Sequence, residues 1–205
     1  VCFIDADPLV YAMAFIGQED VEQPDGSTKR VVRWFSYIEP NLVNQIEKIC
    51  EACDSETPPF LFLSGDTNFR DDIATVKEYK GNRVAERPYH YDNVRVFIRS
   101  RYNTYTSKGC EADDLLAMSM TEYRKKDIPC IVCTIDKDLL QVPGWHYRWE
   151  THNSGEVKPH FVDELGHVEG EYIEGVSEKT GKPTRKFDLR SFKGSGYKWF
   201  IAQTL

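Results

Sequence analysis

The chain has 205 residues, 40% of them hydrophobic, and a formal net charge of −7. This length and apolar content are typical of one large domain, or one domain with an appendage, and they exclude global disorder. The longest apolar run, "LVYAMAFI", is too short to cross a bilayer, and the opening "VCFIDADP" lacks the basic stretch of a secretory signal. We therefore expect a cytoplasmic protein with reduced thiols and no membrane partner.

Apolar runs of strand length alternate with helical periodicities over the first 150 residues. The predicted elements, in chain order, are a strand at 1–4, a helix at 9–15, a polar loop or hairpin at 17–30, a helix at 41–53, a strand at 58–65, a helix at 91–102, a strand at 104–106, a helix at 111–126 and strands at 128–135 and 145–150. Leu116 and Met120 lie on the expected core face of the helix at 111–126. This alternation predicts an α/β fold with a largely parallel central sheet and flanking helices.

The pattern changes after residue 150. Strand-like runs within 158–190 flank a Thr-Gly-Lys-Pro turn, which predicts a β-hairpin, and "YKWFIAQTL" predicts the start of a helix. We therefore expect an α/β core domain over residues 1–150, followed over residues 151–205 by a β-hairpin appendage and the start of a helical region.

Acidic residues follow four of the predicted strands. A single acid at such a place is usually a helix cap or a partner of the helix dipole. Together they would repel one another at one edge of the sheet unless cations compensate them. Oxygen ligands favour Mg²⁺, Mn²⁺ or Ca²⁺, and several carboxylates suffice for two Mg²⁺ ions about 3.5–4 Å apart. The acids of this predicted metal edge are Asp5, Asp7, Asp66, Glu111, Asp113, Asp114, Asp136 and Asp138.

The cysteines form two Cys-x-x-Cys pairs, Cys50 with Cys53 and Cys130 with Cys133. Cys130 and Cys133 lie in a predicted strand, where residues three apart point to opposite faces. Buried thiols are the expected state of both pairs, and a structural zinc site is the alternative. The five histidines show no ligand spacing, so none is assigned to a metal.

Basic and aromatic residues give weaker indications. Residues 77–108 contain eight Lys or Arg and three Asp or Glu, and this basic stretch beside an acidic edge suits a polyanionic substrate reached through metal ions. Trp145, Tyr147 and Trp149 alternate along a predicted strand and so share one face. Packing in the core is the expected role of the three, and a stacking platform for bases is the alternative.

Four motifs resemble those of one enzyme family. They are "FIDADPLVY", "FLSGDTNFRDDIATVKEYKGNR", "CEADDLLA" and "TIDKDLLQV", in that order along residues 1–150. The sequence resembles the 5′-nuclease family, which includes phage 5′→3′ exonucleases, the 5′-nuclease domain of bacterial DNA polymerase I and the flap endonucleases. The resemblance implies a PIN-like fold and a role in DNA replication or repair, in a bacterium or from a phage in its host.

The resemblance also implies the metal ligands. Asp5, Asp66, Glu111 and Asp113 would surround a first Mg²⁺. Asp136 and Asp138 would hold a second Mg²⁺, with Asp113 between the two ions and Mn²⁺ able to substitute. Asp114 would belong to the same metal site and orient ligands or bound water. Asp7 has no firm counterpart in the family; if it is not functional, it is expected to be a local turn acceptor. Lys137 is expected to be structural or solvated.

The same resemblance implies substrate contacts. Lys80 and Arg83 would reach the scissile phosphodiester as catalytic residues, Tyr79 would lie near them against the terminal base, and Arg70 would touch phosphate. The expected substrate is DNA with 5′ ends, flaps or nicks, with RNA–DNA hybrids as a second candidate. The chain is expected to act as a monomer.

Two departures from the family pattern affect these expectations. A Gly-Asp-x-x-Asp-like element that supplies further second-metal ligands would follow a helix like "KWFIAQTL", and the sequence reaches Leu205 before it. The second metal site is therefore expected to be incomplete within these residues. The stretch from Arg83 to Glu111 leaves room for roughly one helix, so a helical arch for threading DNA is expected to be reduced or absent.

Three functions remain open from the sequence. The leading one is a metal-dependent 5′-nuclease that leaves a 5′-phosphate. The second is a PIN-like ribonuclease, against which "EYKGNR" argues. The third is a structure-specific DNA-binding module without catalysis.

Overall fold

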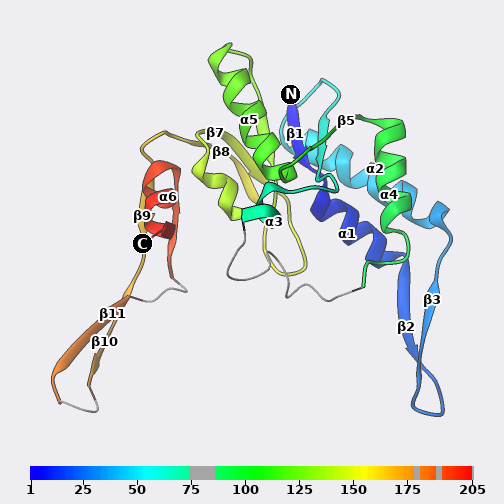
Figure 1. The fold of residues 1–205 in the computed structure, drawn as a ribbon, viewed down its shortest axis with the longest axis horizontal. Helices are drawn as coiled ribbons and strands as arrows, with labels where there is room; N and C mark the ends of the chain where they lie inside the picture. The colour runs from blue at the N-terminus through cyan, green and yellow to red at the C-terminus, as the bar shows by residue number, and fades with distance from the viewer. Residues whose placement is uncertain (74–85, 178–180, 188–190, 205) are drawn as a thin grey trace.

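The computed structural model describes residues 1–73, 86–177, 181–187 and 191–204. Its centre is a six-stranded sheet in the order β5-β4-β1-β6-β7-β8, in which the first five strands are parallel and β8 is antiparallel to β7 (Figure 1). The strands are β1 (Cys2–Asp5), β4 (Phe60–Leu63), β5 (Asn103–Thr106), β6 (Ile131–Cys133), β7 (Gly144–Arg148) and β8 (Val157–Val162). The predicted α/β class with a mostly parallel sheet is confirmed.

Helices cover both faces of this sheet. On one face lie α1 (Asp7–Ile16), α2 (Phe35–Ala52) and α4 (Tyr91–Arg101), and on the other lies α5 (Ala112–Lys125) (Figure 1). Strand residues alternate between the two cores: Ile4 packs with the first group of helices, whereas Phe3 packs against α5. Leu116 and Met120 are fully buried in the α5 core, as predicted.

Short elements connect and extend this core. They are the hairpin β2 (Gln18–Glu22) and β3 (Thr28–Val32), the short helix α3 (Phe69–Ile73) and the 3₁₀ helix η1 (Lys137–Gln141). The hairpin confirms the turn predicted at Pro-Asp-Gly. Helix α2 begins at Phe35, earlier than the predicted 41, although Pro40 lacks a backbone donor. The earlier start buries Ile38 completely, and this burial outweighs the missing hydrogen bond.

The C-terminal region forms small antiparallel pairs. β10 (Tyr172–Val176) pairs with β11 (Pro183–Phe187) in the predicted hairpin, which projects from the core, and β9 (His167–Glu169) pairs with β12 (Lys193–Ser195) (Figure 1). Helix α6 (Gly196–Thr204) follows and packs on η1, β9 and β12. A boundary at residue 150 stays a prediction, although β8 lies beyond it and extends the main sheet.

The three alternating aromatic residues Trp145, Tyr147 and Trp149 do not all pack in the core. Tyr147 and Trp149 are buried, but Trp145 is 49% exposed and meets Phe161 of β8 edge-to-face. The expectation of core packing is therefore wrong for Trp145, whose ring is half exposed beside Phe161 on the neighbouring strand of the same sheet. Among the described residues, no helix combines the length and apolarity needed to span a membrane.

Candidate active site

Two adjoining cavities meet at the carboxyl ends of the parallel strands, and the larger continues along α5 as far as Arg124 and Pro143. The larger has a volume of about 1150 Å³ and the smaller about 450 Å³. The charged residues that line the smaller cavity are Asp5, Asp7, Glu111, Asp113, Asp136 and Lys137, and those that line the larger are Arg70, Glu111, Asp113, Asp114, Arg124, Asp138 and Glu164. Glu111 and Asp113 line both cavities, so they form the wall between them.

Asp5 is the most buried carboxylate of the site. It ends β1 with only 6% of its surface exposed, and the Thr134 hydroxyl donates to its Oδ2 at 2.9 Å. Burial raises the pKa of Asp5 to about 7, and repulsion from Asp7 adds to this effect. An ionised carboxylate is therefore costly at this position unless a positive charge is nearby.

Asp7, at the start of α1, contacts a residue that follows β4 and a residue of α4. The backbone N–H of Ser64 donates to both of its carboxylate oxygens, at 3.2 and 3.1 Å. Arg95 of α4 approaches Asp7 Oδ1 at 3.4 Å and donates to the Ser64 carbonyl at 2.6 Å. These contacts join the start of α1 to the end of β4, which supports the interpretation of Asp7 as a structural acceptor.

The acids at the start of α5 serve the helix and the cavities together. Glu111 is the N-cap residue, and its backbone N–H donates to Asp114 Oδ2 at 3.1 Å. The backbone N–H of Asp114 donates to Asp113 Oδ1 at 2.8 Å. Burial raises the pKa of Asp113, and the charges of Asp114 and Glu111 raise it further. The helix-cap interpretation is thus correct, but it does not explain why Asp113 turns into both cavities.

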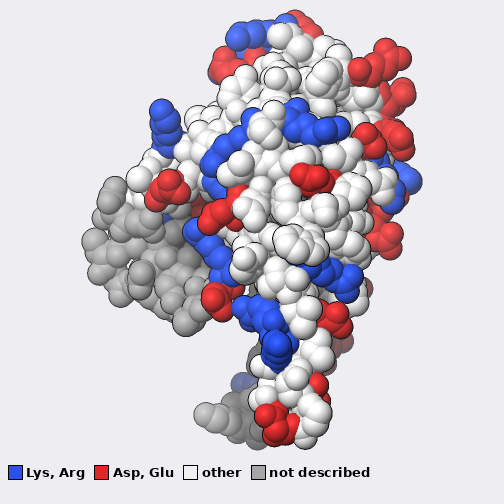
Figure 2. All heavy atoms as spheres, turned by 90° about the vertical axis from the view of Figure 1, so that its right-hand side faces the viewer, with Lys and Arg blue, Asp and Glu red and all other residues white. Residues whose placement is uncertain are grey.

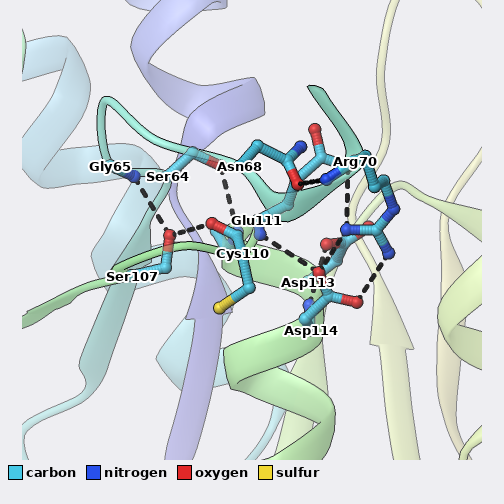
Figure 3. A network of polar contacts seen from close by, with 10 residues as sticks. Ser64, Gly65, Asn68, Arg70, Ser107, Cys110, Glu111, Asp113 and Asp114 are labelled. Atoms are coloured by element: carbon cyan, nitrogen blue, oxygen red, sulfur yellow. Dashed lines mark hydrogen bonds and ion pairs between the residues drawn. The ribbon is translucent and has the colours of Figure 1, made fainter. Parts of the chain in front are cut away.

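A hydrogen-bond network joins the loop after β4 to the loop before α5 (Figure 3). The Gly65 N–H donates to Ser107 Oγ at 3.0 Å, and that hydroxyl donates to the Cys110 carbonyl at 2.7 Å. The Ala112 N–H donates to Ser64 Oγ at 3.0 Å. A Cβ at Gly65 would lie 2.1 Å from the Ser107 carbonyl oxygen, so only glycine allows this approach. The network holds the start of α5 in place.

Arg70 of α3 faces this helix start (Figure 3). Its two terminal nitrogens donate to the two carboxylate oxygens of Asp114, at 2.5 and 2.8 Å, and Nη1 lies 3.9 Å from Glu111 Oε2. This is the fork geometry of a bidentate arginine–carboxylate pair. Asp114 is therefore neutralised and oriented by Arg70.

Asp136 and Asp138 lie at the start of η1, after β6. Asp136 is the N-cap residue and accepts a hydrogen bond from the Asp138 N–H at 2.9 Å. Burial raises the pKa of Asp138, and the nearby charge of Asp136 raises it further. Asp136 lines the smaller cavity and Asp138 lines the larger, so each cavity receives one carboxylate of this pair.

Asp66 occupies a different environment. It lies in the loop between β4 and α3, is exposed, and lines neither cavity. Its assignment as a metal ligand stays a prediction that would require the loop to bring the carboxylate inward.

The oxygen chemistry of the donor set suits divalent cations of the magnesium type, although among the described residues no three of these carboxylates bring their oxygens within 4.8 Å of one another. Asp5, Asp113 and Asp138 all have raised pKa values, because burial and neighbouring carboxylates disfavour their charged forms. A divalent ion in each cavity would compensate these charges with the oxygen ligands that Mg²⁺ and Mn²⁺ prefer.

The comparison with known families agrees with the four motifs. The sequence profile described as "5'-3' exonuclease, N-terminal resolvase-like domain" matches residues 1–164. The chain belongs to this family. None of the curated proteins matches the chain in sequence.

The fold of this 5′-3′ exonuclease-family chain is similar to that of a solved phage protein. The bacteriophage T5 D15 protein, co-crystallised with metal ions, superposes with a TM-score of 0.53 at 16% identity, over 77% of this chain and 57% of that one. A T5 D15 flap endonuclease pseudo-enzyme-product complex with DNA and metal ions has a TM-score of 0.49 at 13% identity, with the same coverage. The chain thus spans somewhat more than half the length of these structures.

The predicted phosphate contacts of this family member are only partly described. Tyr79, Lys80 and Arg83 lie outside the described residues, so their roles stay predictions. Arg70 lines the larger cavity, but its established contact is with Asp114, and a contact with phosphate stays a prediction.

The basic stretch does not form one continuous surface among the described residues. Arg95 is 7% exposed and pairs with Asp7, so it does not face solvent. Glu86, an acid of this stretch, pairs with Arg30 of the β2–β3 hairpin at 3.1 Å. Figure 2 shows basic and acidic side chains interspersed on the face that lies on the right in Figure 1. Sequence position alone could not show that Arg95 turns inward.

The sequence did not predict that residues of α6 line the larger cavity. Tyr197 and Phe200 of α6 and Leu165 line it opposite α5. Lys137 lies 5.7 Å from the ring centre of Trp199, which is 2% exposed, and this contact attaches α6 to η1. The only signal was the apolar spacing of "YKWFIAQTL", which predicted a helix without its partner. Lys137 also lines the smaller cavity, so its expected structural or solvated role stays a prediction.

Proposed function

We propose that this chain is the core of a metal-dependent 5′→3′ exonuclease or flap nuclease that hydrolyses DNA phosphodiesters. The observation that carries the proposal is the pair of carboxylate cavities sharing Glu111 and Asp113, in a chain of the 5′-3′ exonuclease family. In the reaction, water would attack phosphorus and the P–O3′ bond would break, leaving a 5′-phosphate and a 3′-hydroxyl.

Acidic residues of the chain would hold the metal ions, and neighbouring side chains would position these acids. Two Mg²⁺ ions, or Mn²⁺ in their place, would supply activation of water and neutralisation of the charge that develops on phosphate. Asp5, Glu111 and Asp113, with Asp66, would hold one ion, and Asp136 and Asp138 the other. The Thr134 hydroxyl fixes the Asp5 carboxylate, and Arg70 fixes Asp114. These contacts would keep the ligands in position when substrate arrives.

Substrate would be held mainly by basic side chains. Lys80 and Arg83 would stabilise the reacting phosphate, Tyr79 would lie against the terminal base, and Arg70 would contact a phosphate from the wall of the larger cavity. DNA with 5′ ends, flaps or nicks is the proposed substrate, and RNA–DNA hybrids are the second candidate. We propose that the protein acts as a monomer in the cytoplasm of a bacterium or of a phage-infected host, in DNA replication or repair.

Cleavage assays on defined substrates test this proposal. The chain is incubated with a 5′-flap duplex and a recessed 5′-end duplex, in Mg²⁺ and in EDTA, and product ends and DNA affinity are measured. Asp113→Ala should abolish cleavage but preserve binding, because affinity comes mainly from phosphate contacts. Glu122→Ala is the matched control, since Glu122 lies on the same helix, is exposed and lines neither cavity.

Each outcome has a definite meaning. Magnesium-dependent cleavage lost only in Asp113→Ala supports the proposal. DNA binding without cleavage by the wild-type chain in Mg²⁺ or Mn²⁺ would leave a DNA-binding module, and cleavage of RNA alone would leave a ribonuclease. Near wild-type cleavage by Asp113→Ala would remove this residue from the mechanism.

A further inference from the structure

Four of the six cysteines meet inside the protein, on the sheet face covered by α2. Cys2 comes from β1, Cys133 from the neighbouring strand β6, and Cys50 and Cys53 from the end of α2. Cys130, three residues before Cys133, packs in the opposite core, as strand alternation predicted. The sequence predicted buried thiols, with a structural zinc site as the alternative, but it did not predict this convergence of three chain segments.

The sulfur atoms lie at distances that suit one metal ion. The ligand atoms of Cys2, Cys53 and Cys133 are all within 4.8 Å of one another, and Cys53 Sγ lies 3.6 Å from Cys133 Sγ. A tetrahedral zinc ion with bonds of about 2.3 Å to sulfur separates its ligands by about 3.8 Å. The cluster is thus close to a zinc-binding geometry before any movement, and all six cysteines are free thiols.

A fourth sulfur is available on the more open side. Cys50 lies one helical turn before Cys53 and packs against the same core, but its sulfur is not among the three that lie within 4.8 Å of one another, so it would have to move inward to bind the ion. Cys2 and Cys133 are fully buried, whereas Cys50 and Cys53 are partly exposed. The Ser55 N–H donates to the Cys50 carbonyl at 3.0 Å, and Asp54 adopts a φ of 49°, so a tight turn fixes the Cys-x-x-Cys pair. An ion could therefore enter past α2 and be enclosed by the two strands.

We propose that Cys2, Cys50, Cys53 and Cys133 form a structural zinc site, separate from the carboxylate cavities. Sulfur ligands select zinc over magnesium, so the two kinds of site would not compete for the same ion. On binding, the thiols release their protons to solvent and the ion joins the end of α2 to β1 and β6. These two strands carry Asp5 and Asp136 at their carboxyl ends, so the zinc would stabilise the framework of the carboxylate site. The proposal does not depend on nuclease activity.

Metal analysis of the whole chain tests the proposal. The protein is purified with a thiol reductant, exchanged into excess Mg²⁺ without a chelator so that magnesium displaces zinc from the carboxylate cavities, and its retained zinc is measured. We expect about one zinc ion per chain, as in structural four-cysteine sites, and its loss in Cys53→Ser and Cys50→Ser. Cys110→Ser and Cys130→Ser are the controls, because these cysteines lie outside the cluster, and both should retain the ion.

Cobalt substitution distinguishes sulfur ligation from binding at the carboxylates. Added Co²⁺ should give a thiolate-to-cobalt charge-transfer band that disappears in Cys53→Ser but persists in Asp113→Asn. A strong chelator should lower the melting temperature of the wild type and of Cys130→Ser, but not that of Cys53→Ser. This last comparison uses a half-buried cysteine, so the variant is expected to fold.

Three results would overturn the zinc site. The first is a reduced wild-type chain that retains no zinc and gives no charge-transfer band. The second is a band that persists in Cys53→Ser or vanishes in Asp113→Asn. The third is a disulfide within the cluster in protein isolated under reducing conditions, which would make it a redox pair instead.

Discussion

Replacing Asp5 with asparagine tests whether its buried charge lowers folding stability when no metal ion is bound. Asp5 is 6% exposed, and burial raises its pKa to about 7 from an ordinary value of 3.8. The Thr134 hydroxyl that donates to Asp5 can also donate to the amide oxygen of asparagine. Asp5→Asn thus removes the charge with little change in packing.

The magnitude follows from the difference between the folded and unfolded pKa values. Below pH 3.8 the carboxyl is protonated in both states, and between 3.8 and about 7 the unfolded chain releases its proton first. Folding stability is therefore lost as the pH rises through this window, by up to about 4 kcal/mol at 1.36 kcal/mol for each pH unit. In EDTA at pH 8, Asp5→Asn should be about 2–4 kcal/mol more stable than the wild type, and nearly equal to it at pH 4.

Urea denaturation at several pH values, with and without Mg²⁺, measures this difference. Mg²⁺ should stabilise the wild type at pH 8 by mass action and stabilise Asp5→Asn much less. Asp92→Asn, an exposed acid on α4, is the control and should follow the wild type. A variant that is less stable than the wild type at pH 8, with no trend in pH, would refute the idea that Asp5 is held at an electrostatic cost.

Four further variants test other parts of the site and core. Arg70→Gln should lower the free energy of unfolding by about 1–3 kcal/mol in urea, because Asp114 loses its bidentate partner; no loss would make that pair dispensable. Lys80→Ala and Arg83→Ala should each reduce single-turnover cleavage by about 10²-fold and DNA affinity far less; equal losses would mean they only recruit DNA. Burial lowers the pKa of His146 to about 4, so stability should fall as the pH drops from 6.5 towards 4, and His146→Gln should weaken that dependence.

Local sequence patterns predicted the elements of the core because burial follows their periodicity. The two-residue period of "FLFL" and the helical spacing of Leu116 and Met120 both reappear as buried faces. The edge rule for parallel sheets placed Asp5, Glu111, Asp113 and the acids after β6 together, since it depends only on strand direction.

Contacts between distant segments could not be predicted in this way. The pairing of Arg70 with Asp114 depends on how α3 is placed above α5, and no spacing in the sequence encodes it. The cysteine cluster joins residues 131 positions apart in the chain, from Cys2 to Cys133. For Trp145 the sequence predicted burial that the structure does not show. The two-residue period of a strand indicates the face of the sheet on which a side chain lies, but not whether another element covers that face.

The most direct test of the two-cavity account is to locate bound manganese. Anomalous diffraction from crystals of the chain grown with Mn²⁺ would show each ion by its own signal. The account predicts one ion touching Asp113 in the cavity of Asp5 and a second on the side of Asp138, about 3.5–4 Å apart. Manganese found only at other surface acids, with none within coordination distance of Asp113, would contradict it.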